Sequence, residues 1–225
     1  MTVLVLNAFI RPLLEGRLPV WAQPRWFATT EELYALAPEA EIGWFDSIDL
    51  DAAPEAARRA DKLSWLNTLG AGVDQFPLGL LAERGVAFTN GAGLGAIPIA
   101  EYVVLGMLTI AKGWREVVRA QDRHQWLGDA PGKQELFGSK AMVLGAGGIG
   151  GRVAELLRPW GVDVVTVRRN PGVQDIGMDQ WRGRLGAFDW VIVAGASTPG
   201  TARIPGPAGI AAHEAPARPV HRARG

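Results

Sequence analysis

The sequence predicts an α/β protein with two parallel-sheet domains, the second of which is incomplete. Three observations predict this fold. Short β-rich runs alternate with helical patterns from the N-terminus to Thr201, a glycine-rich turn opens the second such series, and the alternation stops after Thr201. The 225 residues suffice for more than one domain.

The first domain is expected over residues 1–95. Its predicted strands are residues 3–6, 41–45, 63–67 and 86–89, and its predicted helices are residues 30–36, 52–59 and 78–84. Thr29 or Thr30 ahead of Glu32 is a pattern typical of a helix N-cap. Helices between strands favour parallel pairing, because each crossover must return the chain to the same end of the sheet.

A connector of two helices, residues 97–112 and 114–125 within the segment 96–127, is expected to lead to a second domain over residues 128–201. That domain is predicted to contain strands 140–144, 162–167 and 190–193 and helices 148–160 and 178–185. A doubly wound nucleotide domain usually has about six strands, so half of one is missing. Residues 202–225, rich in Ala, Pro, Arg and Gly, are expected to be a disordered tail.

Composition excludes several classes of function. Lys plus Arg and Asp plus Glu each total 23, so no basic surplus predicts binding to nucleic acid or to an anionic membrane. The apolar stretch 91–111 is broken by Pro98 and Glu101, which argues against a membrane span. With no cysteine and no signal-peptide pattern at the N-terminus, a cytoplasmic protein is expected, and no metal site is predicted.

A G-x-G-x-x-G motif follows the predicted strand 140–144 and opens the next helix. Gly145 permits a tight turn, Gly147 lets the backbone approach a pyrophosphate, and Gly150 allows close packing of helix on strand. Gly148 and Ile149 lie in the first helical turn, where free N–H groups face an anion. The motif therefore predicts a dinucleotide site, and the alternative is a glycine-rich turn without a ligand.

Arg168 and Arg169 stand where NAD sites generally carry an Asp or Glu that reads the ribose. Two guanidinium groups at this position could pair with a 2′-phosphate, which favours NADP over NAD while leaving NAD open. The alternative is that both arginines are solvated charges after a strand.

Several motifs occur together in an order typical of one family. Residues 65–74 read Trp-Leu-Asn-Thr-Leu-Gly-Ala-Gly-Val-Asp, and they precede residues 83–86, Thr89, Asn90, Ala100, Glu101, Trp126 and the glycine motif. Over residues 60–201 the chain resembles the D-isomer-specific 2-hydroxyacid dehydrogenases, and within them the NADPH-dependent glyoxylate/hydroxypyruvate reductases. The resemblance implies two flavodoxin- or Rossmann-like domains and an oxidoreductase acting on a small 2-keto or 2-hydroxy acid.

The resemblance also implies roles for particular residues. Gly70, Ala71 and Gly72 would offer backbone N–H groups to the substrate carboxylate, and Gly195 would lie beside the dinucleotide. The alternative for the first loop is a plain strand-to-helix turn in which Asp74 caps the next helix. Relatives generally pair through the connector helices, so a homodimer through residues 96–127 is expected.

No catalytic residue is assigned. The family's substrate-binding Arg, its proton-donating His and the acid that orients this His lie beyond the matched segment. His124 is expected to be a surface residue of the connector, and His213 and His221 lack the family's surroundings. Residues 211–214 stand where the family commonly shows Ala-Ala-Met-Lys, so truncation or a one-base frameshift near Thr201 is expected. The chain is then either a reductase with impaired turnover or a non-catalytic remnant that still binds a dinucleotide.

Overall fold

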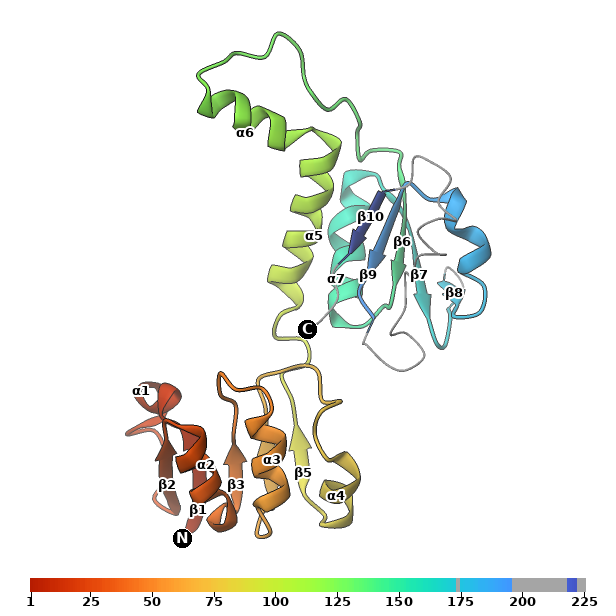
Figure 1. The fold of residues 1–225 in the computed structure, drawn as a ribbon. Coiled ribbons are helices and arrows are strands. Elements are labelled where there is room, and N and C mark those ends of the chain that lie inside the picture. Colours follow the sequence, from red (N-terminus) through yellow and green to blue (C-terminus); the bar gives the residue numbers. More distant parts are fainter. Residues whose placement is uncertain (173–174, 196–217, 222–225) are drawn as a thin grey trace. The chain divides into compact units, whose positions relative to one another are not determined.

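The computed structural model describes residues 1–172, 175–195 and 218–221 (Figure 1). The chain divides into two units, Met1–Ala92 and Gly93–Gly225. Each unit has one parallel sheet with helices against it, so the predicted α/β class is confirmed.

The first unit has a five-stranded sheet in the order β2-β1-β3-β4-β5, and every pairing is parallel. The strands are β1 (Thr2–Asn7), β2 (Ala22–Phe27), β3 (Ile42–Trp44), β4 (Trp65–Asn67) and β5 (Ala87–Thr89). Its α-helices are α1 (Arg11–Leu14), α2 (Thr30–Leu36), α3 (Ala52–Arg59) and α4 (Leu78–Glu83). All four predicted strands and all three predicted helices are present.

Local sequence explains most of these elements. Thr29 accepts from the N–H of Glu32 while the Glu32 carboxylate accepts from the N–H of Thr29, so α2 begins with a complete capping box. Alanines on one side of α3 pack onto a core that includes Val5, Phe27 and Leu66. Strand β2 was not predicted. It contains Pro24, which is tolerated because β2 is an edge strand and needs no ladder hydrogen bond on its outer side.

The second unit begins with α5 (Ala96–Ala111) and α6 (Trp114–Asp122). One side of α5 is buried against α7 (Gly148–Leu157), through Ala100, Val103 and Met107 (Figure 1). Among the described residues no single helix is long and apolar enough to cross a membrane. Helices α5 and α6 pass that test only as a pair, and the pair is bent by 73°.

The second sheet has the order β10-β9-β6-β7-β8, again all parallel. Its strands are β6 (Lys140–Leu144), β7 (Asp163–Arg168), β8 (Asp175–Gly177), β9 (Trp190–Val193) and β10 (Arg218–His221). Numbered along this unit and taken from the β8 edge, the order is 3-2-1-4-5, which is that of the first five strands of a doubly wound nucleotide-binding sheet.

Three expectations for this unit were wrong. The sheet was expected to have three strands, half of a doubly wound domain, but five strands are described. Residues 178–185 do not form a helix: β8 precedes them, and a 3₁₀ helix covers Arg182–Ala187. The absence of any packed element after Thr201 was also expected, yet β10 pairs with β9. A four-residue edge strand tolerates a proline such as Pro219, so proline content alone did not exclude a strand there. The remainder of the predicted tail, residues 202–217 and 222–225, lies outside the described residues.

Candidate functional site

The glycine turn between β6 and α7 contains two positions that only glycine can occupy. Gly145 has φ +100°, and a Cβ on it would lie 2.5 Å from the Cα of Gly195. A Cβ on Gly150 would lie 1.8 Å from the carbonyl oxygen of Gly145. The first turn of α7 therefore packs directly on the turn, and Ala194 and Gly195 after β9 lie against it.

Gly147 is placed differently, because nothing lies within 4 Å of a Cβ built on it. It is the N-cap of α7, and no side chain makes a cap hydrogen bond there. The N–H groups of Gly148, Ile149 and Gly150 in the first turn have no partner among the described contacts. These N–H groups and the positive end of a ten-residue helix can together bind an anion such as a phosphate.

Beside β7, on the neighbouring strand β8, the carboxylate of Asp175 binds several groups. Asp175 accepts from the Thr166 hydroxyl and from the N–H of Gly172 at 2.9 Å, and its Oδ2 lies 3.0 Å from Nε of Arg168. These hydrogen bonds and the nearby arginines lower the pKa of Asp175. Arg169 is exposed and makes no ion pair within the described part of the chain. The two arginines, which are expected from the sequence to act together, therefore differ: Arg168 has an ion-pair partner and Arg169 has none among the described residues.

In the first unit, the loop after β4 is held by side chains from neighbouring strands. Asp46, just after β3, accepts from the Thr68 hydroxyl at 2.6 Å and from the N–H of Leu69 at 2.9 Å. The Thr68 oxygen in turn accepts from the N–H of Gly70 at 3.2 Å. Asn90, just after β5, donates to the carbonyl of Ala71 at 2.8 Å.

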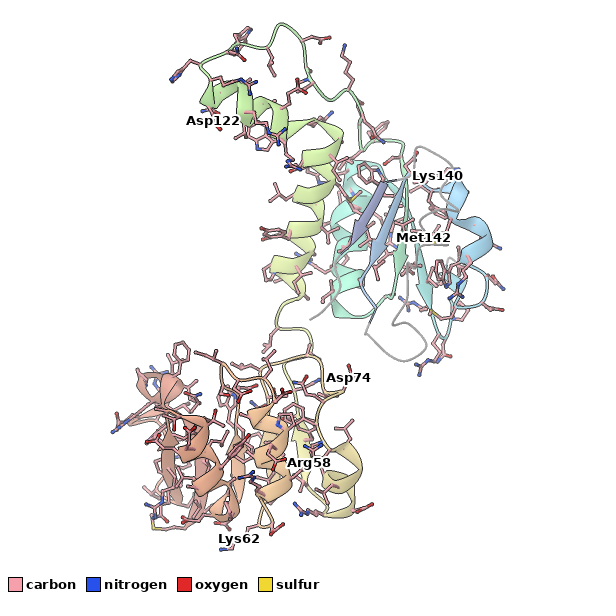
Figure 2. All side chains as sticks on the ribbon, in the orientation of Figure 1. Arg58, Lys62, Asp74, Asp122, Lys140 and Met142 are labelled. Atoms are coloured by element: carbon pink, nitrogen blue, oxygen red, sulfur yellow. The ribbon has the colours of Figure 1, made fainter. Side chains whose placement is uncertain are left out.

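These hydrogen bonds leave only some backbone N–H groups of the loop available to a ligand. The N–H groups of Leu69 and Gly70 are already used, whereas those of Ala71 and Gly72 have no partner among the described contacts. Both residues are exposed. Asp74, which Figure 2 labels, makes no described cap contact with α4, and the N-cap of α4 is Pro77. Two of the three predicted donors, Ala71 and Gly72, are therefore available to a small anion.

The other residues considered as functional candidates have no described contacts that indicate a role. His124 follows α6 with φ 53° and is exposed, and Glu101 is exposed on the first turns of α5. His213 lies outside the described residues. Groups of three or more metal-ligating side chains do not occur in the ranges that the structure describes.

No role was predicted from the sequence for Asp46 or Asp175, and Asn90 was placed in a motif without a role. Asp46 and Asn90 each follow a predicted strand, and polar residues at the carboxyl ends of parallel strands are a usable signal. Asp175 had no such signal, because β8 itself was not predicted.

The chain belongs to the D-isomer specific 2-hydroxyacid dehydrogenases, since the model of that family's NAD binding domain matches residues 104–225. This is the family that the motifs resemble. The match extends past Thr201, so the expectation that the resemblance ends there was wrong. Strand β10, in the fifth position of the sheet, lies within the matched residues.

Individual relatives are distant. D-3-phosphoglycerate dehydrogenase of Methanocaldococcus jannaschii is 25% identical over 137 residues, which are 61% of this chain and 26% of that protein. Erythronate-4-phosphate dehydrogenase of Shewanella sediminis is 28% identical over 103 residues, 46% of this chain and 22% of that protein. The matched segments thus span about a quarter of these relatives.

Solved structures share the fold across the whole chain. A glyoxylate reductase from Paecilomyes thermophila has a TM-score of 0.78 at 17% identity, covering 100% of this chain and 74% of its own. D-Lactate dehydrogenase from Aquifex aeolicus, complexed with NAD and lactic acid, has a TM-score of 0.77 at 17% identity, covering 99% and 69%. The two-unit α/β architecture is therefore that of known structures.

Proposed function

We propose that the protein is an NAD(P)H-dependent oxidoreductase that reduces a small 2-keto acid of the glyoxylate or hydroxypyruvate type. The observation that carries the proposal is the turn at the start of α7, where Gly147 leaves open space in front of unpartnered N–H groups. A pyrophosphate fits that chemistry, because backbone donors and a helix dipole both favour a phosphate anion. When bound, the dinucleotide supplies the hydride.

Within this proposal, NADPH is the preferred cofactor and NADH the alternative. The end of β7 carries Arg168 and Arg169 where an acidic ribose reader would otherwise stand. Arg169, exposed and without an ion pair in the described region, is the stronger candidate to contact a 2′-phosphate. Gly195, whose backbone lies against Gly145, would line the same dinucleotide.

The substrate carboxylate is assigned to the loop after β4. Ala71 and Gly72 offer two free N–H groups there, while Gly70 shapes the loop through its bond to Thr68. Two neutral backbone donors suit a monoanion without side-chain charge. A small 2-keto acid is therefore favoured over a larger polyanion.

A second function is dinucleotide binding without turnover. It is favoured because few described side chains near the loops after β4 and β6 could act as an acid or base. Of the described side chains only His124 is an imidazole, and it follows α6 rather than a strand end. Proton donation to a developing alkoxide needs a group that titrates near neutrality. In this second function the chain binds the cofactor, and reduction is weak or absent.

We further propose a homodimer through α5 and α6. The sides of these helices that do not pack in the unit expose Tyr102, Leu105, Trp114 and Val118. Exposed apolar residues gathered on adjacent helices are typical of a protein interface. A cytoplasmic location stays a prediction from the sequence.

An NADPH-oxidation assay with glyoxylate and hydroxypyruvate separates the two functions. The reductase proposal expects a saturable rate that is lost in Gly147→Val, whose side chain would occupy the space in front of the α7 N–H groups. Gly151→Ala, also in open space but one turn further along α7, is the control and should keep the rate. Absence of a rate together with retained NADPH binding supports the non-catalytic function.

A further inference from the structure

Arg168 and Arg169 are neighbours in sequence but differ in their electrostatic surroundings. Nε of Arg168 lies 3.0 Å from Oδ2 of Asp175, and the two side chains are 44% and 15% exposed. Arg169 is exposed and makes no ion pair with another described residue. One arginine is therefore neutralised by a largely covered carboxylate, and the other keeps its full charge.

We propose that Asp175 is a specificity-determining residue of the cofactor site. It acts as a counter-ion that neutralises Arg168 and thereby leaves Arg169 as the main contact for an adenosine 2′-phosphate. This inference rests on the proposed function, because it assumes that a dinucleotide binds at the carboxyl end of β7.

The strand register indicates that the ion pair keeps the Arg168 side chain away from the expected ligand position. The Cα of Asp175 pairs with that of Thr166, two residues before the end of β7, whereas Arg168 itself pairs with Gly177. The partner of Arg168 thus lies beside the strand rather than beyond its carboxyl end. Nucleotides bind beyond the carboxyl ends of such strands, so the ion pair holds Arg168 back from the ligand.

The carboxylate is itself fixed in place. Thr166 and the N–H of Gly172 both donate to it, in addition to Arg168. A carboxylate bound by three donors does not readily turn away to release Arg168, because Thr166 and the N–H of Gly172 would lose their acceptor as well. The pairing therefore persists when the 2′ position of the ligand is occupied.

The charges of these groups predict whether removing the Asp175 carboxylate strengthens or weakens NADPH binding. An arginine beside a carboxylate presents almost no net charge to a phosphate, and the carboxylate also repels that phosphate. Removing the carboxylate should strengthen binding of the phosphorylated cofactor more than that of NADH. If Asp175 instead oriented Arg168 toward the phosphate, removing it would weaken NADPH binding, so the two roles predict opposite signs.

Calorimetric titration of the full chain with NADPH and with NADH tests the proposal. The variants are Asp175→Asn, Arg168→Ala and Arg169→Ala, with Asp163→Asn at the exposed start of β7 as a control of equal charge change. We expect Asp175→Asn to raise the ratio of NADPH to NADH affinity about three- to tenfold, the range of one partly screened charge contact. Arg169→Ala should lower that ratio more than Arg168→Ala, and Asp163→Asn should leave it unchanged.

The outcomes separate this inference from the proposed function. If the native chain binds neither nucleotide, the proposed function fails and the inference with it. If the native chain binds both nucleotides but Asp175→Asn lowers the ratio or leaves it unchanged, only the inference fails. If Asp175→Asn does not fold, the two arginine variants still test the inference. It is overturned if Arg168→Ala lowers the ratio of NADPH to NADH affinity as much as Arg169→Ala does, or more.

Discussion

The two glycine loops of this chain, after β4 in one unit and after β6 in the other, keep their shape by different means. The loop after β4 is held by side chains, with Asp46 and Asn90 bonded to groups of residues 68–71. The nearest atom to a Cβ on Gly70 is 3.5 Å away, which is ordinary contact. The turn after β6 is held by backbone packing, since a Cβ on Gly145 or Gly150 would collide with main-chain atoms.

The difference shows where each loop is vulnerable. A loop held by hydrogen bonds tolerates changes at its glycines but depends on distant polar residues. A turn held by close backbone approach depends on its own glycines and tolerates changes elsewhere.

The largest effect is expected from Gly150→Ala. The new Cβ would lie 1.8 Å from the Gly145 carbonyl oxygen, a collision with backbone that no side-chain rotation relieves. We expect a loss of about 3 kcal/mol or more in the free energy of unfolding of the second unit, measured by urea denaturation. Gly151→Ala is the control and should stabilise α7 by about 0.5–1 kcal/mol. A Gly150→Ala protein of native stability would contradict the account of the turn.

An intermediate effect is expected from Asp46→Ala. The change leaves the buried Thr68 hydroxyl and the N–H of Leu69 without their acceptor, which should cost about 1–3 kcal/mol. Amide hydrogen exchange of residues 68–72 should accelerate accordingly. Asp74→Ala, an exposed change in the same region, should leave both quantities almost unaltered (Figure 2). Equal effects from the two variants would show that side chains do not hold this loop.

The smallest effect concerns pH, and it arises at the end of β7 in the proposed cofactor site, where the side chain of Asp175 binds its neighbours. Hydrogen bonds from Thr166 and Gly172, and then the charge of Arg168, lower the pKa of Asp175. The resulting stabilisation is complete above the ordinary carboxyl pKa of about 3.9 and is lost as pH falls through the lowered folded-state pKa. It should not exceed about 1 kcal/mol, because Arg168 is partly exposed.

Thermal unfolding of the native chain and of Asp175→Asn between pH 7 and pH 2 measures this effect. The native chain should have the higher Tm at neutral pH, and the two values should converge in acid. A difference that persists unchanged at pH 2 would assign the stabilisation to something other than the ionised carboxylate.

The same contrast between local and distant partners explains how far the sequence predicts this molecule. The G-x-G-x-x-G turn, the capping box of α2 and the strands β6 and β7 were predictable, because each rests on residues close together in the chain. The partners of the loop after β4 were not, because Asp46 and Asn90 are 23 and 19 residues from the groups they bind. Strands β2 and β10 were not predicted because both contain proline, and β8 was not predicted because two of its three residues, Asp175 and Gly177, are types that strands disfavour.

The central claim is that the start of α7 binds the phosphates of a dinucleotide, and calorimetry of NADPH binding to Gly147→Ala tests it most directly. Since a methyl group at Gly147 meets no protein atom within 4 Å, it should leave the Tm unchanged and block only the approach of a ligand. The account predicts measurable binding to the native chain and to Gly151→Ala, and at least about tenfold weaker binding to Gly147→Ala. Equal affinity of the Gly147→Ala and native proteins, or no nucleotide binding by the native chain, would contradict it.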